Sequence, residues 1–587
     1  MTKEDLINLK KHISELSEEE KKSEVVNPND RKYYYMLNRN KKYMDYTALS
    51  FGNRRISYEE MHECINNYAK VLFNKGIRHG DIIGVCALNT PESIYLLYAL
   101  DLIGAITVGF NPFDNKDKIK KDIEITKPKM IITVDMNYSN FKEYEKALNF
   151  STILYSPVTS IDDKKIKIGY NIKQLLDGNY KLSKTSYLSS LIKNYKDNSL
   201  FIKSRYIQNE ITDIMFTGGS TGIHKGVDLY GSGLNYVVEG MNALFTPYPG
   251  MVHLGEIPVG SMSYGKMLMH YALCNNMEFA LTLKAMPEDF YDELVRTGAE
   301  AAAGGPPHWV SLIEKSGDKF IPNKKVKEGS LSNLKYATSG GEAMKKNTYF
   351  AIMDAFKKGN SSAVLGDGLG STETWGTIIV NNGSEINPDT IGRKISTINV
   401  RVINPNTGLD AKPGEKGLLF VSGPSIMKGY HNNTEESEKV LKKIDGENWL
   451  NLGDYLIENE NGTFRYVGRQ KRNFVSNVEN IYPEQLEDYL TKIPEIREVV
   501  VTPISDEIRQ FIPKLHISLY NENENIEVLE NKINKLILQK FGINWVPGYY
   551  EYYYEPLKRM INTKIDFGYY QNKDLEELKA KNKKLEL

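Results

Sequence analysis

The stretch FTGGSTGIHKGV, residues 216–227, combines glycines, hydroxyl side chains and one lysine, and it directly follows the strand-like segment ITDIM. Glycines let backbone N–H groups approach phosphate oxygens without an obstructing Cβ. Ser220 and Thr221 would add hydroxyl donors, and Lys225 would add a positive charge. The stretch therefore indicates a strand that runs into a phosphate-binding loop. Taken alone, it is also compatible with a flexible turn that binds no ligand.

The spacing within the loop argues against two common nucleotide-binding motifs. In the Walker loop, G-x-x-x-x-G-K-[ST], a glycine precedes the lysine and a magnesium-binding hydroxyl follows it. Here Lys225 follows His224, and Gly226 stands at the hydroxyl position. The dinucleotide motif G-x-G-x-x-G does not match either. A P-loop kinase or NTPase is therefore disfavoured, and the ligand has to be inferred from other segments.

Strand-like and helix-like segments alternate through the first part of the chain. GDIIGVCAL (80–88) and ITVGFNP (106–112) are typical of strands, whereas TPESIYLLYALDLIGA (90–105) is typical of a helix. A further helix is predicted after Ser57, an N-cap with Glu60 three residues on. This alternation predicts an α/β fold with parallel strands. Short strands dominate residues 399–467 and predict a small β-barrel-like subdomain.

The same patterns suggest the domain organisation. Residues 1–40 are expected to be a charged helical N-terminal extension, residues 41–468 a large domain of layered α/β subdomains, and residues 469–587 a small mobile α+β domain. The Lys-, Asn- and Ser-rich segment around 150–210 has weak periodicity and is expected to be variable surface structure. No compositional linker marks the last boundary, which rests on the motif after Gly468.

Composition limits the classes of function. The 587 residues contain 75 Lys and Arg against 75 Asp and Glu, a balance that argues against nucleic-acid binding. Three cysteines without a CxxC pair predict neither disulfides nor a zinc site. The charged N-terminus is unlike a signal peptide, and the apolar run at 94–110 is interrupted and too short to span a membrane. We expect a cytoplasmic protein without a transmembrane segment.

Further motifs follow the glycine loop along the chain. They are LKYATSGGEAM (334–344), GDGLGSTETWG (366–376), WLNLGDYL (449–456), YVGRQKRNFVSNVENIYPEQLE (466–487) and NTKID (562–566). In this order they resemble the motifs of the adenylate-forming superfamily, which includes acyl-CoA synthetases, luciferases and the adenylation domains of peptide synthetases. The resemblance covers roughly residues 45–570 and is nearest in style to the acyl- and aryl-CoA ligases.

The resemblance implies a role for each matching residue. Lys564 would be the catalytic lysine, Thr372 would bind the α-phosphate, Glu373 would coordinate Mg²⁺, and Lys471 would be the hinge between the domains. The residues expected around the ATP phosphates are Thr217, Gly218, Gly219, Ser220, Thr221, Gly222 and Lys225. Those expected around the adenine and ribose are Gly341, Glu342, Ala343, Asp367, Gly368, Leu369, Asp454 and Arg469.

The resemblance also implies a reaction in two steps. A carboxylate first attacks the α-phosphate of ATP, and gives an acyl-adenylate and pyrophosphate. The small domain then rotates, and the thiol of coenzyme A or of a carrier-bound pantetheine attacks the adenylate. The expected partners are thus a small carboxylic acid and, as an alternative to coenzyme A, a carrier protein. A stand-alone enzyme that acylates a carrier protein is the second interpretation, and a degenerate homologue with a binding role is the third.

Several positions depart from the usual motifs. His224 replaces a proline of the glycine loop, Leu369 replaces an aromatic residue beside adenine, and Val478 replaces a glycine beside the pantetheine tunnel. The segment LKRMINTKID lacks the usual proline, threonine and glycine around Lys564. PVGSMSYG (258–265) lacks the histidine of the acid-pocket motif. The residues expected to line the acid pocket, which are equally compatible with an ordinary core, are Met262, Tyr264, His308, Trp309 and Trp375.

Overall fold

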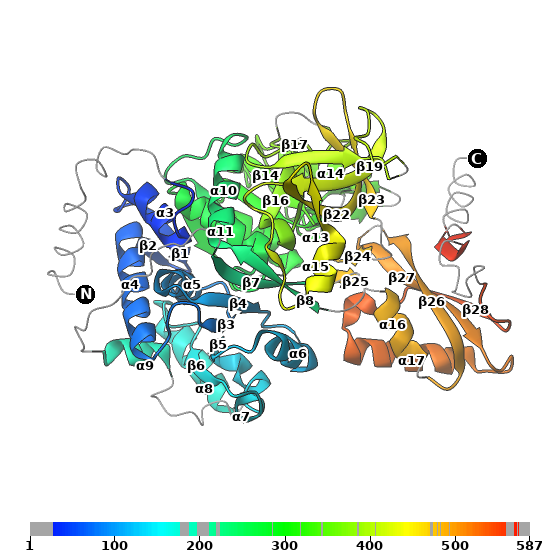
Figure 1. Ribbon diagram of the computed structural model, residues 1–587, viewed down its shortest axis with the longest axis horizontal. Helices are drawn as coiled ribbons and strands as arrows, with labels where there is room; N and C mark the ends of the chain where they lie inside the picture. The colour runs from blue at the N-terminus through cyan, green and yellow to red at the C-terminus, as the bar shows by residue number, and fades with distance from the viewer. Residues whose placement is uncertain are drawn as a thin grey trace.

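The chain folds into layered α/β subdomains, an antiparallel sheet and a C-terminal α+β body (Figure 1). The computed structural model describes residues 27–114, 116–176, 187–195, 210–218, 224–284, 286–316, 319–341, 344, 346–383, 387–405, 407–469, 474–477, 479–481, 483–491, 493–506, 508–558, 569–571 and 573–574. Within these residues no helix is both long enough and apolar enough to cross a bilayer. The predicted fold class is confirmed.

The strand that leads into the glycine loop lies in a mostly parallel sheet of order β20-β8-β7-β4-β3-β5-β6. Its strands are β3 (Ile82–Cys86), β4 (Ile106–Phe110), β5 (Met130–Val134), β6 (Ser151–Tyr155), β7 (Ile211–Gly218), β8 (His224–Tyr230) and β20 (Gly429–Tyr430). β4 pairs in parallel with β3 and β7, whereas β7 and β8 form an antiparallel pair on either side of the loop. The predicted strands at 80–88 and 106–112 are confirmed.

A second sheet has the order β17-β16-β15-β14-β11-β9-β10-β1-β2. Its strands are β1 (Thr47–Phe51), β2 (Arg54–Ser57), β9 (Val252–Gly255), β10 (Glu278–Leu281), β11 (Ala301–Gly304), β14 (Tyr336–Gly340), β15 (Leu365–Ser371), β16 (Gly376–Val380) and β17 (Arg393–Lys394). The pairs from β10 to β15 are parallel, so the carboxyl ends of β11, β14 and β15 lie together. A short hairpin joins β12 (Ile313–Ser316) and β13 (Lys319–Pro322).

Helices pack against the sheets of the large domain and of the C-terminal body, and some of them, such as α4 and α5, begin at a side-chain cap. They are α3 (Lys32–Asn40), α4 (Tyr58–Asn74), α5 (Pro91–Ile103), α6 (Lys116–Thr126), α7 (Glu145–Leu148), α8 (Lys164–Leu176), α9 (Leu188–Lys193), α10 (Gly231–Asn242), α11 (Ser263–Cys274), α12 (Phe290–Thr297), α13 (Pro306–Val310), α14 (Lys346–Lys358), α15 (Thr434–Val440), α16 (Pro483–Leu490) and α17 (Ile526–Lys540). The predicted cap at Ser57 is confirmed, since its side chain accepts a hydrogen bond from the Glu60 N–H at 3.1 Å.

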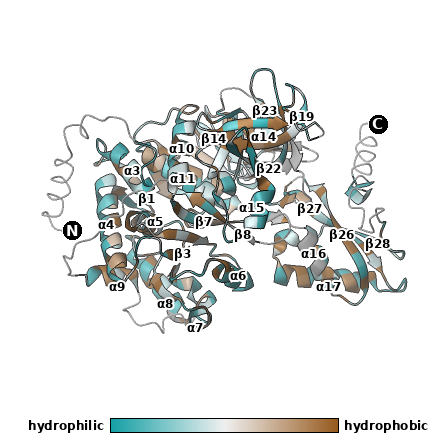
Figure 2. Ribbon diagram, viewed as in Figure 1, coloured by the Kyte–Doolittle hydropathy of each residue, from teal (hydrophilic) through white to brown (hydrophobic). Residues whose placement is uncertain are grey.

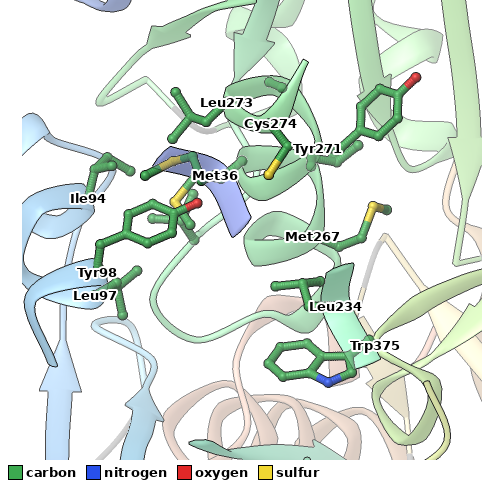
Figure 3. Packing of buried hydrophobic residues seen from close by; sticks show 14 of the residues in the cluster. Met36, Ile94, Leu97, Tyr98, Leu234, Met267, Tyr271, Leu273, Cys274 and Trp375 are labelled. Atoms are coloured by element: carbon green, nitrogen blue, oxygen red, sulfur yellow. The ribbon is translucent and has the colours of Figure 1, made fainter. Parts of the chain in front are cut away.

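The main core lies where α5, α10 and α11 meet the sheets. Every residue of α5 is buried, as expected of a helix that is apolar on all sides. Figure 3 shows Leu234 of α10 and Met267 of α11 in one hydrophobic cluster with Met36, Tyr98 and Trp375. Hydrophobic residues run along β3 and β7, whereas the outward helix α6 is hydrophilic (Figure 2). This core supports the strand that enters the glycine loop.

Helix α3, in the segment expected to be an N-terminal extension, is packed into this core. The Lys32 ammonium contacts the Asp213 carboxylate of β7, and Lys266 of α11 contacts the same carboxylate at 2.6 Å. Both lysines are buried, so the shared counter-ion offsets much of the cost of removing their charges from water. The part of the extension before residue 27 lies outside the described residues.

The β-rich segment at 399–467 forms an antiparallel sheet. It contains β18 (Asn399–Ile403), β19 (Lys416–Ser422), β21 (Leu441–Ile444), β22 (Glu447–Glu458) and β23 (Phe464–Arg469). The C-terminal body has a sheet of β24 (Phe474–Ser476), β25 (Glu479–Ile481), β26 (Ile496–Asp506), β27 (Gln510–Leu519) and β28 (Tyr549–Tyr553). Helices α16 and α17 pack against this sheet through a separate hydrophobic cluster, as expected of an α+β domain.

Candidate active site

The two ends of the glycine loop are fixed by the antiparallel pair β7–β8. Thr217 lies opposite Lys225, and Gly218 lies opposite His224. The predicted phosphate ligands Gly219, Ser220, Thr221 and Gly222 lie outside the described residues. Thr217 is half-buried and Lys225 is buried. The structure thus describes the base of the predicted phosphate loop, with its lysine held on a strand.

Lys225 and Glu373 are brought together by one tyrosine. The Lys225 ammonium lies 4.6 Å from the centre of the Tyr430 ring, and the Tyr430 hydroxyl donates a hydrogen bond to Glu373 Oε1 at 3.0 Å. Lys225 also contacts the carboxylate of Glu436 in α15. Since the ring face attracts the ammonium and the hydroxyl holds the carboxylate, Tyr430 links the predicted phosphate-binding lysine to the predicted metal ligand.

Thr372 and Glu373 lie in a single helical turn, residues 372–374, that follows β15. The backbone carbonyl of Glu373 accepts a hydrogen bond from the Met427 N–H at 2.7 Å, and the Ser263 hydroxyl lies 3.5 Å from the Thr372 hydroxyl. A Cβ at Gly370 would lie 2.1 Å from the Gly376 carbonyl oxygen, so the turn requires glycine there. These contacts fix the direction of both predicted ligands.

The residues expected around adenine lie at the ends of two neighbouring strands. In the parallel pair β14–β15, Gly340 lies opposite Gly368, and Gly341 continues with a φ of 85°. Burial raises the pKa of the Asp367 carboxyl to about 7. Leu369 is half-buried against the main core. Glu342 and Ala343 lie outside the described residues.

Asp454, expected on the ribose, is 2% exposed in β22. The Tyr466 hydroxyl donates a hydrogen bond to Asp454 Oδ1 at 3.3 Å. The β22–β23 register places Asp454 opposite Arg469, although the side chain of Arg469 is not described. A strand pairing therefore brings these two predicted nucleotide ligands together. The predicted hinge Lys471 and the predicted catalytic Lys564 lie outside the described residues.

Two of the predicted acid-pocket residues meet at Thr338 of β14. The Trp309 indole N–H donates to the Thr338 carbonyl at 3.1 Å, and the Tyr264 hydroxyl hydrogen-bonds the Thr338 side chain. The Tyr264 hydroxyl also lies 3.8 Å from the position that a Cβ of Gly340 would take. Thr338 borders an apolar cavity of about 40 Å³, whose other lining residues include Met241, Phe245, Leu268, Tyr271 and Ala302. Tyr264 thus lies beside the predicted adenine strands, and Thr338 connects these strands to the cavity.

The remaining predicted pocket residues have different surroundings. Trp375 is fully buried, and its indole N–H donates to the Tyr230 carbonyl at 2.8 Å. Met262 is 45% exposed before α11. His308 accepts the Gly305 N–H at 3.1 Å on Nδ1, and its Nε2 lies 3.0 Å from the buried Glu256 carboxylate. These contacts leave Nε2 as the protonated nitrogen and give His308 a structural partner.

Sequence reasoning did not identify Tyr430, Glu436 or Glu256. Tyr430 and Glu436 stand in MKGYHNNTEES (427–437); Tyr430 lies 57 residues from Glu373 along the chain, and Glu436 lies 211 residues from Lys225. No local pattern connects such distant positions. The local signal that could have pointed to Tyr430 is a tyrosine that follows a glycine shortly before a capped helix.

The described residues fit the groups that the motifs imply. Glu373 is half-buried, one of its oxygens is oriented by Tyr430, and a carboxylate is the oxygen ligand that Mg²⁺ prefers. Lys225 stands at the loop base with an anionic partner already in contact, so an anion fits beside its ammonium. The arrangement is therefore suited to a polyphosphate with a divalent cation.

Comparison with known proteins agrees with this class of site. Residues 37–431, more than half of the chain, match the model of the AMP-binding enzyme family, and the chain belongs to that family. Among similar proteins, a long-chain-fatty-acid–CoA ligase of Bacillus subtilis is 25% identical over 477 residues, which cover 80% of this chain and 82% of the relative. A 4-coumarate–CoA ligase of Arabidopsis thaliana is 22% identical over 533 residues, which cover 87% and 85%.

Solved structures show the same fold. An amide bond synthetase from Marinactinospora thermotolerans superposes with a TM-score of 0.74 at 17% identity, over 92% of this chain and 99% of that chain. The o-succinylbenzoate CoA synthetase of Bacillus subtilis superposes with a TM-score of 0.70 at 18% identity, over 92% and 97%. At these identities the likeness establishes the architecture, and the specific reaction has to be argued from the site.

Proposed function

We propose that the protein is an ATP-dependent carboxylate–CoA ligase, which forms AMP and pyrophosphate through an acyl-adenylate. The observation that carries the proposal is the contact chain from Lys225 through Tyr430 to Glu373. It links the base of the predicted phosphate loop to the predicted metal carboxylate, two groups that the transfer of an adenylyl group requires. The names of the relatives, fatty-acid–CoA and 4-coumarate–CoA ligases, support coenzyme A as the acceptor.

The proposal gives each residue a task in adenylation. Lys225 and the glycine loop hold the β- and γ-phosphates, Thr372 binds the α-phosphate, and Asp454 with Arg469 holds the ribose. Glu373 would hold Mg²⁺, which would supply charge neutralisation at the phosphates. Lys564 places a compact positive charge at the reacting oxygens, where negative charge develops in the transition state. Most of the catalysis is then positioning and electrostatics, as in other phosphate-transfer reactions.

The acid that we propose is apolar or aromatic. Supporting this, the cavity beside Thr338 is lined mostly by apolar side chains from α10, α11 and the second sheet. Leu268 and Tyr271 lie four and seven residues after Tyr264, so all three occupy one face of α11. This face of α11 therefore connects the predicted adenine strands, beside Tyr264, with the apolar cavity, beside Leu268 and Tyr271. We propose that the hydrophobic part of the acid points towards this cavity.

The second candidate function differs from the first in the molecule that accepts the acyl group. Val478 stands where related enzymes have a glycine beside the pantetheine tunnel, and this substitution favours a modified acceptor step. An enzyme that acylates a pantetheinylated carrier protein is therefore the alternative. In both functions Lys471 is the proposed hinge for rotation of the small domain.

Product analysis tests the proposal. Purified protein is incubated with ATP, Mg²⁺, coenzyme A and a panel of aliphatic and aryl acids, and the products are identified by chromatography and mass spectrometry. We expect AMP and an acyl-CoA with at least one apolar acid. AMP without acyl-CoA, together with acylation of a pantetheinylated carrier, would favour the alternative. ADP as the nucleotide product would reject both, and the absence of any turnover would favour a binding role.

A further inference from the structure

Lys225 already has an anionic partner in the structure. Its ammonium contacts Glu436 Oε2 and lies over the Tyr430 ring, while the lysine side chain is 6% exposed and that of Glu436 is 24% exposed. A nearly buried ammonium without a counter-ion would be strongly destabilising. Glu436 thus supplies, from α15, the negative charge that a phosphate would supply in a nucleotide complex.

Glu436 has a second cation available. Lys439, one turn later on α15, places its ammonium 2.6 Å from Glu436 Oε1, and the same ammonium lies 2.9 Å from Glu435. The backbone N–H of Glu436 donates to the Asn433 side chain at 3.1 Å, which fixes the start of the helix. Hydrogen bonds from Lys225 and then Lys439 hold the pKa of the Glu436 carboxyl at about 2. Because Lys439 contacts the other carboxylate oxygen, Glu436 remains paired if Lys225 leaves it.

We propose that Glu436 is a placeholder for the terminal phosphates of the nucleotide: it holds the Lys225 ammonium at the loop base until polyphosphate replaces it, and Lys439 then keeps its carboxylate paired. This inference rests on the proposed function for the role of Lys225 as a phosphate ligand. Glu436 acts through Lys225 and is a positioning residue. The pair keeps the long Lys225 side chain at the loop base before the ligand arrives.

The exchange has a measurable consequence, because the carboxylate competes with pyrophosphate for one ammonium. Glu436→Gln removes the competing charge and keeps the side-chain shape. We expect it to bind inorganic pyrophosphate about three- to tenfold more tightly, the scale of a partly exposed ion pair. Release of pyrophosphate should slow by a similar factor, since most changes of affinity appear in the dissociation rate.

A matched control lies next to the test position. Glu435→Gln removes the same charge from the same helical turn, but Glu435 contacts Lys439 and is 84% exposed. Binding of inorganic pyrophosphate and of ATP, each with Mg²⁺, is measured by calorimetry on the full chain. We expect Glu435→Gln to bind like the wild type, and the Lys225→Ala/Glu436→Gln double variant to bind no more tightly than Lys225→Ala alone. Thermal unfolding verifies that each variant is folded.

Opposite outcomes are distinguishable. Unchanged or weaker pyrophosphate binding by Glu436→Gln, with normal binding by the wild type, would overturn the placeholder and leave the proposed function intact. Equal tightening by Glu435→Gln would also overturn it, because a general charge effect would then explain the result. A wild-type protein that binds neither ATP nor pyrophosphate would contradict the proposed function itself.

Discussion

Tyr430 is the residue on which the geometry of the site depends. Its ring lies under Lys225, and its hydroxyl orients Glu373. Groups that orient a metal ligand commonly change metal affinity when they are removed. The hydroxyl and the ring can be separated experimentally, because phenylalanine keeps the ring and loses the donor.

Tyr430→Phe is expected to raise the Mg²⁺ concentration needed for half-maximal adenylation about tenfold, the lower end of such orienting effects. Nucleotide binding without metal should change little, since the ring remains under Lys225. The measurement is the Mg²⁺ titration of AMP formation. Tyr520→Phe, at a position 65% exposed, is the control. An unchanged Mg²⁺ requirement would show that Glu373 does not depend on this hydroxyl.

The raised pKa of Asp367 predicts that the stability of the folded protein depends on pH. Burial raises the pKa of its carboxyl from 3.8 to about 7, so between these values the folded protein binds a proton that the unfolded chain has lost. The contribution to stability is therefore present at low pH and is lost as pH rises towards 7. Relative to Asp367→Asn, the wild type should lose about 2 kcal/mol of unfolding free energy between about pH 5 and about pH 8.

Urea denaturation of the wild type and of Asp367→Asn, at about pH 5 and at about pH 8, measures this difference in unfolding free energy. A pH-independent difference between wild type and Asp367→Asn would contradict the raised pKa.

At the scale of elements, some structure follows directly from the sequence. The cap at Ser57 and the alternation of β3, α5 and β4 were predictable, because the hydrogen bonds and the periodicity that define them are local. The burial of α3 was not predictable, since Arg31 and Lys32 are typical of a solvated face. They are buried because carboxylates from distant segments, including Asp101 and Asp213, meet them.

The candidate site divides in the same way. Thr372, Glu373 and Asp454 could be predicted because each stands in a short motif. Tyr430 and Glu436 were missed because their contacts join positions far apart along the chain, which one sequence does not reveal.

The C-terminal sheet contains a buried polar cluster that closes on Asp574. Its carboxylate accepts hydrogen bonds from Thr502 at 2.6 Å, Lys514 at 2.5 Å and His516 Nε2 at 2.9 Å. Burial opposes its ionisation, but these hydrogen bonds outweigh burial and hold the pKa of Asp574 below its ordinary value. The Lys514 ammonium, also 2.9 Å from Glu551, already supplies the cation for these carboxylates.

Asp574→Ala should therefore destabilise the C-terminal body by about 2 kcal/mol, because it removes the buried carboxylate to which Thr502, Lys514 and His516 all donate. Hydrogen exchange at the amides of β27, which carries both residues, is the measurement, and the exchange of β3 in the large domain is the internal control. Equal protection of β27 in both proteins would contradict the prediction. The wild-type stabilisation should also fall as pH drops through the lowered pKa of Asp574.

In the whole molecule, the proposed reaction requires the large domain and the C-terminal body to act together. The described residues on either side of Lys564 are held near each other, since the Lys558 N–H donates to the Tyr570 hydroxyl at 2.7 Å. Between the two bodies, Lys540 of α17 lies 3.0 Å from Asp117 of α6, an exposed pair of the kind that contributes about 0–1 kcal/mol. Such a contact presents little resistance to the proposed rotation.

The most direct test of the central claim is acid-dependent exchange of labelled pyrophosphate into ATP, measured for the wild type and for Lys564→Ala. We predict exchange that requires both Mg²⁺ and an apolar acid and that falls at least about 100-fold in Lys564→Ala, as expected when a transition-state charge is removed. Exchange that is unaffected by Lys564→Ala, or no exchange with any acid of a broad panel, would contradict adenylation by this site.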